Sequence, residues 1–228
     1  MTPEHYDIII IGAGLSGIGT ASHIAREYPH KRIAIIERRE KVGGTWDLFR
    51  YPGIRSDSDM ASFGFNFKPW YSNKVLAKGG DIRDYVADTA REFGLYDKIK
   101  YGLKIDHADW SSRDQRWELS TLHEASGEDR HFTCDFMVNC AGYYNFDRGY
   151  QPHFAGQERF KGEIVHPQHW PESLDYKGKK VVVIGSGATA ITVVPAMAEK
   201  AEKVTMLQRS PSYIMAMPDT DKLSMALN

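Results

Sequence analysis

The sequence is poor in cysteine and carries almost no net charge. Only Cys134 and Cys140 occur among 228 residues, and they do not form a Cys-x-x-Cys pair. This spacing argues against disulfide-reductase chemistry and against a zinc ribbon, so both thiols are predicted to be reduced packing residues in a cytoplasmic protein. Because the net charge is -1, the composition also argues against a nucleic-acid partner.

Long apolar runs and targeting signals are also missing. No apolar run approaches the roughly 18 residues that a membrane span needs, so no transmembrane segment is predicted. The chain passes from Met1–Asp7 directly into the apolar stretch Ile8–Ile11, with no basic region or small-residue cleavage site before it. We therefore expect no signal peptide.

What the sequence does contain is one strand–helix–strand pattern near each end. Tyr6–Ile11 is continuously apolar, which is typical of a parallel strand buried on both faces. Apolar residues at helical spacing over Leu15–Glu27 predict a helix, and Arg32–Glu37 predicts a second strand. This order predicts a right-handed βαβ unit. A second unit is predicted from the strand Lys180–Ile184, a helix from Ala188 to about Lys200, and the strand Val204–Leu207.

The region between these units is predicted to contain a helix and a small antiparallel insertion. Asp81–Phe93 has one apolar face, and a fourth strand over Asp135–Cys140 returns to the first unit. The antiparallel insertion at about residues 100–134 is predicted from the strands Lys104–Trp110, Arg116–Leu122 and Arg130–Thr133. The fold class is therefore α/β, with two dinucleotide-binding, Rossmann-like domains and an antiparallel insertion in the first.

The first glycine motif reads Gly12-Ala-Gly14-Leu-Ser-Gly17 and joins the first strand to its helix. In this context the first glycine permits a tight turn, the second lets the backbone approach a pyrophosphate, and the third allows close helix packing. Glu37 follows about 25 residues later, where a carboxylate can accept ribose hydroxyls. An ordinary glycine turn with an exposed glutamate remains the alternative.

The segment Gly43-Gly44-Thr45-Trp46 follows the ribose acid and favours FAD over NAD as the first cofactor. A glycine pair at this place resembles the second phosphate-side contact of flavoproteins with two dinucleotide sites. The alternative is a simple glycine turn.

The second glycine motif reads Gly185-Ser-Gly187-Ala-Thr-Ala190. Aligned on its second strand, Gln208 stands where the first unit has its acid, and Arg209 and Ser210 follow. A guanidinium binds a 2′-phosphate that a carboxylate would repel, so the pattern predicts NADPH rather than NADH. The alternative is a surface arginine without a ligand.

These motifs predict three regions along the chain. Residues 1–142 form the FAD-binding domain, residues 143–178 form a connector, and residues 179–228 begin an NADPH-binding domain. Two strands are too few for a doubly wound domain, so this second domain is expected to be incomplete. Thr220–Leu227 resembles the start of a further helix.

Two longer stretches carry a family resemblance. The segment 160–171 combines Phe160, Gly162, His166, Trp170 and Pro171 in one pattern, and residues 43–57 run from the glycine pair to an aspartate. Together they resemble the motifs of Baeyer–Villiger monooxygenases, which are class B flavoprotein monooxygenases. Within that family they are most like the branch that activates the prodrug ethionamide. The resemblance covers essentially the whole chain but only the N-terminal half of the family.

The resemblance implies an oxidoreductase that reduces FAD with NADPH and inserts one oxygen atom of O2 into a ketone to give an ester or lactone. Sulfides or thioamides are implied as further substrates. The implied FAD site comprises Gly12, Gly14, Ser16, Gly17, Glu37, Gly44, Thr45, Trp46, Asp47, Leu48 and Asp57, with a backbone contact from Ile105. Arg55, Ser56 and Asp57 are implied where nicotinamide meets flavin. The implied NADP site comprises Gly185, Ser186, Gly187, Ala188, Thr189, Ala190, Ile191, Arg209 and Ser210.

The catalytic candidates are Arg55, Asp57 and His166. For His166 a direct acid–base role, a conformational role in the connector and plain packing all stay open. His166 with His169 makes only half a metal site, so no metal is predicted.

Two other functions remain open: an N- or S-oxygenating flavin-containing monooxygenase, and a nucleotide-binding protein without catalysis. The family's active-site arginine and the segment that completes its FAD domain would both lie beyond Asn228. We therefore expect that this chain alone is not a competent oxygenase, and that its second domain could self-associate. The physiological substrate, the oligomeric state and the origin of the shortened chain stay open.

Overall fold

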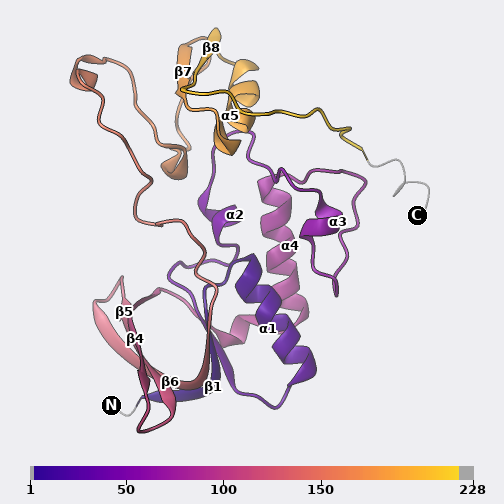
Figure 1. The fold of residues 1–228 in the computed structure, drawn as a ribbon, viewed down its shortest axis with the longest axis vertical. Coiled ribbons are helices and arrows are strands. Elements are labelled where there is room, and N and C mark those ends of the chain that lie inside the picture. The colour runs from indigo at the N-terminus through magenta and orange to yellow at the C-terminus, as the bar shows by residue number, and fades with distance from the viewer. Residues whose placement is uncertain (1–2, 221–228) are drawn as a thin grey trace. The chain divides into compact units, whose positions relative to one another are not determined.

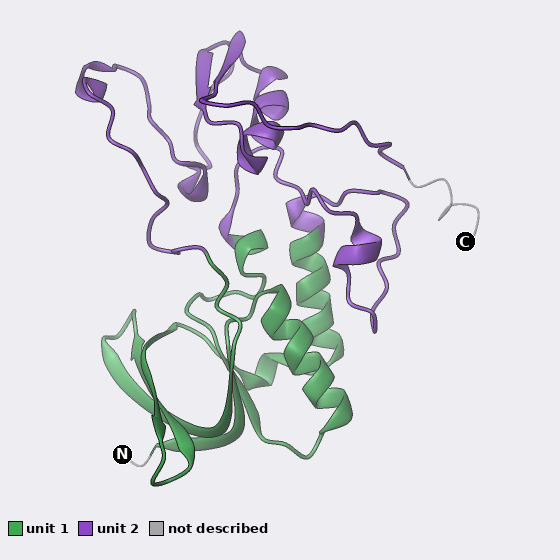
Figure 2. Cartoon of the chain, in the orientation of Figure 1, with its two compact units in different colours: residues 1–47, 82–143 green, residues 48–81, 144–228 purple. Residues whose placement is uncertain are grey.

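A computed structural model describes residues 3–220 of the chain. They divide into two compact units, Met1–Asp47 with Ile82–Tyr143 and Leu48–Asp81 with Tyr144–Asn228 (Figure 2). The domain limits expected from the sequence stay a prediction. The helix expected at Thr220–Leu227 lies, apart from its first residue, outside the described residues.

A six-stranded sheet forms the centre of the first unit (Figure 1). Its strand order is β3-β2-β1-β6-β5-β4. Strand β1 is parallel to β2 and to β6, β2 is parallel to β3, and β4, β5 and β6 are antiparallel neighbours. The strands are β1 (Glu4–Ile11), β2 (Ile33–Ile36), β3 (Ile99–Lys100), β4 (Leu103–Ser111), β5 (Arg116–His123) and β6 (Glu128–Asn139). The predicted α/β class is confirmed.

Strand β6 corrects one detail of the sequence analysis. Arg130–Thr133 and Asp135–Cys140 were expected as two strands, but one continuous strand spans both. Its first part pairs antiparallel with β5 and its second part pairs parallel with β1. Asp135 suggests a break between two apolar runs in the sequence. Its side chain is half-exposed, with Oδ1 3.6 Å from Nε2 of His5, so the strand can continue through this residue without burying its charge.

The apolar strands β1 and β2 are buried on both faces, as their composition predicts. Ile9 packs in a core with Ile36, whereas Ile10 and Ile35 have no exposed surface either and point to the opposite face. Helix α1 (Leu15–Glu27) packs on β1 and β2, and Figure 1 shows it with α4 (Gly79–Glu92) on one side of the sheet. The predicted apolar face of α4 is buried throughout: Ile82, Tyr85, Val86, Thr89 and Ala90.

The second unit contains the other βαβ element. Strands β7 (Lys180–Ile184) and β8 (Lys203–Leu207) are parallel and are joined by α5 (Ala188–Ala198). One face of the strand pair packs with α5 in a core that contains Val181, Val183, Val193, Met197 and Val204. The opposite face exposes Val182, Ile184 and Leu207 by 61%, 59% and 57%. Within residues 3–220 this apolar face has no cover.

The loop that follows Gly43 and Gly44 packs into the core of the second unit. Phe49 and Tyr51 join the core around α5. Gly53 lies so close to that helix that a Cβ there would be 2.3 Å from the carbonyl oxygen of Thr192. The remaining short elements are α2 (Thr45–Leu48), α3 (Met60–Phe63) and the 3-10 helices η1 (Tyr96–Lys98), η2 (Gln157–Arg159) and η3 (Pro167–His169).

Among the residues that the structure describes, no helix combines the length and the apolar character that crossing a membrane requires.

Candidate functional site

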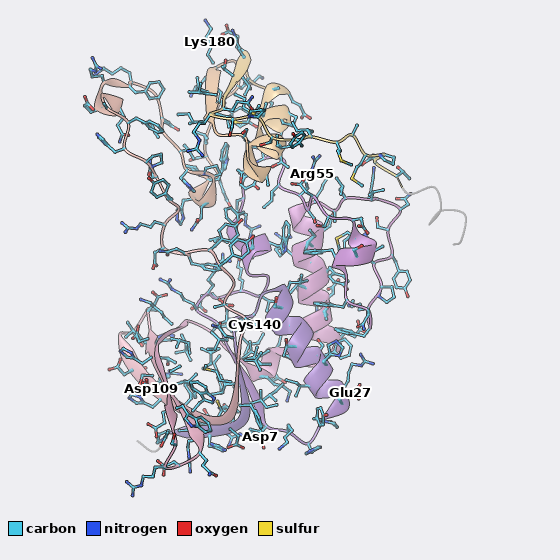
Figure 3. The ribbon with its side chains drawn as sticks, viewed as in Figure 1. Asp7, Glu27, Arg55, Asp109, Cys140 and Lys180 are labelled. Atoms are coloured by element: carbon cyan, nitrogen blue, oxygen red, sulfur yellow. The ribbon has the colours of Figure 1, made fainter. Side chains whose placement is uncertain are left out.

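The first glycine turn lies where β1 ends and α1 begins. Gly12 has φ +98°, and a Cβ at this position would be 2.7 Å from the carbonyl oxygen of Cys140, which follows β6 (Figure 3). A Cβ at Gly17 would be 1.8 Å from the carbonyl oxygen of Gly12. Both predicted glycines are therefore required by the backbone geometry itself.

The start of α1 is suited to an anion. Its N-cap residue is Gly14, which makes no side-chain cap, and the first turn contains no acidic residue. Helix N-termini present N–H groups without intrahelical acceptors and a partial positive charge, so they favour phosphate. A Cβ at Gly44 would be 2.9 Å from Cα of Gly14, so the two predicted glycine segments contact each other directly.

Glu37 is buried at the edge of this turn and is held by two backbone donors. It is only 6% exposed. The backbone N–H of Ala13 donates to Oε2 at 2.7 Å, and that of Arg39 donates to Oε1 at 2.8 Å. An ionised carboxylate has about four acceptor positions, so capacity for two ribose hydroxyls remains. The alternative of an exposed surface glutamate is wrong.

Ala13 connects this acid to the glycine pair. Its N–H binds Glu37, and its carbonyl oxygen accepts the N–H of Gly43 at 3.0 Å. The segment from Glu37 to Gly43 thus meets the first glycine turn at one buried residue. Sequence reasoning missed Ala13 because its role is carried entirely by its backbone.

Arg39 is a second residue in contact with this site that the sequence analysis did not single out. Its guanidinium is 2.7 Å from Oδ2 of Asp47 and donates to the carbonyl oxygen of Gly44 at 3.3 Å. The run Glu37-Arg-Arg-Glu40 has the composition of a solvated charged segment. No pattern in it separates Arg39 from its neighbour Arg38, whose side chain instead forms a two-pronged pair with Glu124.

Tyr101 lies within the electrostatic reach of Glu37, the predicted ribose acid. Burial is the main reason why the pKa of its hydroxyl is raised to about 12, and the negative charge of Glu37 contributes. Ile105, the predicted adenine contact, lies on the edge strand β4 at a register shift between Ile105 and His107.

The second glycine turn repeats the first in a more open form. Gly185 has φ +119° and donates its N–H to Leu207 at 2.8 Å, and Gly187 begins α5 without a side-chain cap. A Cβ at either glycine would meet no atom within 4 Å. The hydroxyl of Ser186 donates to the carbonyl oxygen of Ser210 at 3.0 Å, which brings together two residues of the predicted NADP site.

Other predicted NADP residues surround this turn. Arg209 is exposed beside Ser210, and Ala190 is buried in the first turns of α5. Ala188, Thr189 and Ile191 belong to the same helix.

The loop that carries Arg55 and Asp57, two of the catalytic candidates, belongs to the second unit. Nε of Arg55, which Figure 3 labels, lies 3.5 Å from Oδ1 of Asp57, and both side chains are more than 40% exposed. Ser56 is 5% exposed and donates its hydroxyl to the carbonyl oxygen of Ser58. The loop therefore presents one cation and one anion to solvent and turns the serine hydroxyl toward its own backbone.

The remaining members of the predicted FAD set follow the chain around this site. Ser16 is exposed in the first turn of α1, and Thr45, Trp46, Asp47 and Leu48 form α2. The described first unit thus contains every predicted FAD residue up to Asp47, together with Ile105, whereas Leu48 and Arg55–Asp57 belong to the second unit.

His166 packs against Gly149 within the connector. A Cβ at Gly149 would lie 2.0 Å from Cε1 of the imidazole, and Nδ1 accepts the N–H of Gln168 at 3.2 Å. Gln168 in turn donates its side-chain amide to the carbonyl oxygen of Asn145. This arrangement favours the conformational and packing alternatives over acid–base chemistry.

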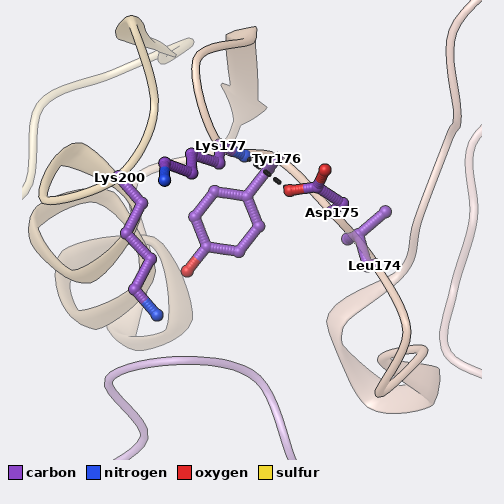
Figure 4. Close-up of a pocket in the computed structure, with 5 residues that line it drawn as sticks. All are labelled: Leu174, Asp175, Tyr176, Lys177 and Lys200. Carbon is purple, nitrogen blue, oxygen red and sulfur yellow. Dashed lines mark hydrogen bonds between the residues drawn. The ribbon is translucent and has the colours of Figure 1, made fainter.

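A surface hollow in the second unit is lined by Leu174, Asp175, Tyr176, Lys177 and Lys200 (Figure 4). Its lining contains no predicted cofactor residue. The ring of Tyr176 also contacts Trp170 edge-on, with centroids 6.4 Å apart. Tyr176 therefore lines the hollow and also packs against the core of the second unit.

Comparison with known proteins shows the family of the chain. A family model described as flavin-binding monooxygenase-like matches residues 5–222. The chain belongs to this family. This flavin-binding monooxygenase-like chain is 63% identical to MymA of Mycobacterium tuberculosis over 98% of its length, covering 46% of MymA. It is 53% identical to the FAD-containing monooxygenase EthA of the same organism, over 99% of the chain and 46% of EthA.

A solved structure supports the same assignment. Cyclohexanone monooxygenase from Rhodococcus sp. Phi1, bound to NADP+, matches with a TM-score of 0.81 and 28% identity, covering 99% of this chain and 43% of that protein. The resemblance to Baeyer–Villiger monooxygenases is therefore confirmed at the level of family and fold. The flavin-binding monooxygenase-like chain spans about half the length of the curated relatives it matches.

Proposed function

We propose that the protein is part of an FAD- and NADPH-dependent monooxygenase of Baeyer–Villiger type, which acts in the cytoplasm on a small ketone. The product is an ester or a lactone that carries one oxygen atom of O2. The family assignment and the likeness to a cyclohexanone monooxygenase support this reaction class. The two uncapped helix starts after glycine turns support two dinucleotide cofactors.

The observation that carries the proposal is the meeting of Glu37, Ala13 and Gly43. A buried acid for the ribose and two touching glycine turns for the pyrophosphate fit the adenosine diphosphate part of FAD. When bound, FAD supplies the two-electron redox chemistry and the reaction with O2. The residues that would hold it are Gly12, Gly14, Ser16, Gly17, Glu37, Gly44, Thr45, Trp46, Asp47, Leu48, Asp57 and Ile105.

For NADPH, the turn around Gly185 and the start of α5 would bind the pyrophosphate. Arg209 would bind the 2′-phosphate, because an exposed guanidinium offers paired donors to a phosphate group. The hydrogen bond between Ser186 and Ser210 would hold the loop of this arginine against the glycine turn.

The chain's own groups nearest to the chemistry would be Arg55 and Asp57. Their opposite charges lie 3.5 Å apart on an exposed loop, so both would be accessible to a bound ligand. His166 is assigned to positioning the connector rather than to proton transfer, because its ring is held against Gly149.

The experiment combines cofactor binding with product analysis on the protein in its natural full-length form. FAD is bound first, and NADPH is added without oxygen while the flavin absorbance is followed. Cyclohexanone and O2 are then supplied and ε-caprolactone is assayed, with methyl phenyl sulfide as a parallel substrate. Flavin reduction by NADPH and lactone formation support the proposal. Sulfoxide without lactone would favour the N- or S-oxygenating alternative, and absence of flavin binding would contradict both.

A further inference from the structure

We propose that Arg39 is a positioning residue that fixes the glycine pair of the flavin site relative to the ribose acid, with the Asp47 carboxylate as its counter-ion. The inference rests on the proposed FAD site and deepens it. It also changes the expected role of the Asp47 side chain, which acts through Arg39 rather than on the cofactor.

The contacts of Arg39 reach both parts of the site. Its backbone N–H donates to Oε1 of Glu37 at 2.8 Å. Its guanidinium donates to the carbonyl oxygens of Gly44 at 3.3 Å and, more weakly, of Asp47 at 3.5 Å. One residue therefore joins the ribose acid to the turn that faces Gly14.

The burial of Asp47 explains why this connection is strong. Its side chain is only 2% exposed, whereas that of Arg39 is 27% exposed. A carboxylate removed from water needs a charged partner, and the guanidinium lies 2.7 Å from Oδ2 as an ion pair, without the alignment of a hydrogen bond. The pair thereby holds the start of α2, in which the N–H of Asp47 donates to the same Gly44 carbonyl that Arg39 contacts.

The Gly44 position matters because there is no spare room around it. Its φ is +54°, and a Cβ built on it would be 2.9 Å from Cα of Gly14. A displacement of the Gly44 turn would therefore disturb its packing against Gly14 at the start of α1, beside which the pyrophosphate is proposed to bind. The ribose acid would stay in place, since Glu37 is held by backbone donors that no side-chain change removes.

This difference between the two parts of the site gives the test. The variants Arg39→Gln and Arg39→Lys are compared with Arg38→Gln, a matched control that removes the same charge one residue earlier. Binding of FAD is measured by flavin fluorescence, and binding of adenosine, which has the ribose but no phosphate, is measured by saturation-transfer NMR.

Arg39→Gln should weaken FAD binding about tenfold or more, the scale of a lost charge-assisted contact. Adenosine binding should change by less than about twofold, and Arg38→Gln should leave both ligands within about twofold of the unaltered protein. Arg39→Lys should recover part of the FAD affinity, because it keeps the charge but cannot contact the carbonyl and the carboxylate in the same geometry. Asp47→Asn, which keeps the side-chain volume, should reproduce the selective loss of FAD if Arg39→Gln does not fold.

Equal losses of FAD and adenosine, or no loss of FAD, would overturn the positioning role while leaving the proposed FAD site intact. Failure of the unaltered protein to bind FAD would overturn the proposed function, and this inference with it.

Discussion

The imidazole of His166 occupies the space that a side chain at position 149 would need. A Cβ built on Gly149 would be 2.0 Å from Cε1 and 2.4 Å from Nε2 of the ring. Such distances cannot occur between real atoms, so glycine is the residue that this contact accepts. The contact joins two parts of the connector, the stretch around residue 149 and the segment 160–171 that carries the family resemblance.

Gly149→Ala should therefore lower the free energy of unfolding by about 1–3 kcal/mol, the usual cost of inserting a methyl group into occupied space. Urea unfolding of the variant measures this. The double variant Gly149→Ala/His166→Ala lacks the imidazole ring. Its loss of stability should therefore be smaller than the sum of the losses in the two single variants.

Gly80→Ala is the matched control for this measurement. A Cβ at Gly80 in α4 would meet no atom within 4 Å, so alanine should raise the free energy of unfolding by roughly 0.5–1 kcal/mol. If Gly149→Ala and Gly80→Ala lose similar amounts of stability, the His166 ring does not occupy the space beside position 149.

Arg209→Ala should reduce the preference for NADPH over NADH about tenfold, because the exposed guanidinium is proposed to read the 2′-phosphate. Affinities for both nucleotides are measured by calorimetry. Lys203→Ala, which removes an exposed cation from β8, is the control and should leave the ratio unchanged. A ratio that is the same in Arg209→Ala and in the unaltered chain would remove Arg209 from the site.

The exposed apolar face of β7 and β8 should support self-association of this chain. Parallel strands are normally covered on both faces, and Val182, Ile184 and Leu207 are each more than half exposed. Sedimentation velocity over a concentration series should show reversible association that Val182→Lys weakens. Tyr28→Lys changes an equally exposed residue of the first unit and should have no such effect. Identical association of both variants would exclude this face as the contact.

Cys134 should make stability fall in alkaline solution. Burial raises the pKa of its thiol from 9.0 to about 11. Above pH 9 the unfolded chain loses this proton while the folded chain keeps it, so unfolding becomes more favourable until about pH 11. Between pH 9 and about pH 11 the free energy of unfolding should fall by about 2 kcal/mol more in the unaltered chain than in Cys134→Ala, in which no thiol titrates at this position. Parallel pH profiles of the two proteins would show that the thiol is not protected by folding.

Much of the first unit follows from local sequence patterns. Apolar runs predict strands buried on both faces, and Ile10 and Ile35 have no exposed surface. The helical spacing from Ile82 to Ala90 identifies the buried face of α4 correctly. The glycines of the first turn could be predicted because a positive φ at Gly12 and a close approach at Gly17 leave no other choice.

Other features depend on contacts between distant segments and could not be predicted. Strand β6 is continuous because its first part pairs with β5 and its second part pairs with β1. Ala13 acts through its N–H and carbonyl oxygen, which every residue type except proline has. Arg39 differs from Arg38 in the acid and the backbone carbonyls that it reaches, and these are decided by the fold.

The central claim is that the first glycine turn and Glu37 together bind FAD. Equilibrium titration of FAD with the unaltered chain, Glu37→Lys and Glu40→Lys tests it most directly. The two variants make the same change of charge, one at the buried acid and one at an exposed glutamate three residues later. Glu37→Lys should weaken FAD binding by at least about 1–3 kcal/mol, and Glu40→Lys should bind like the unaltered chain. Equal FAD affinity of all three proteins would contradict the account.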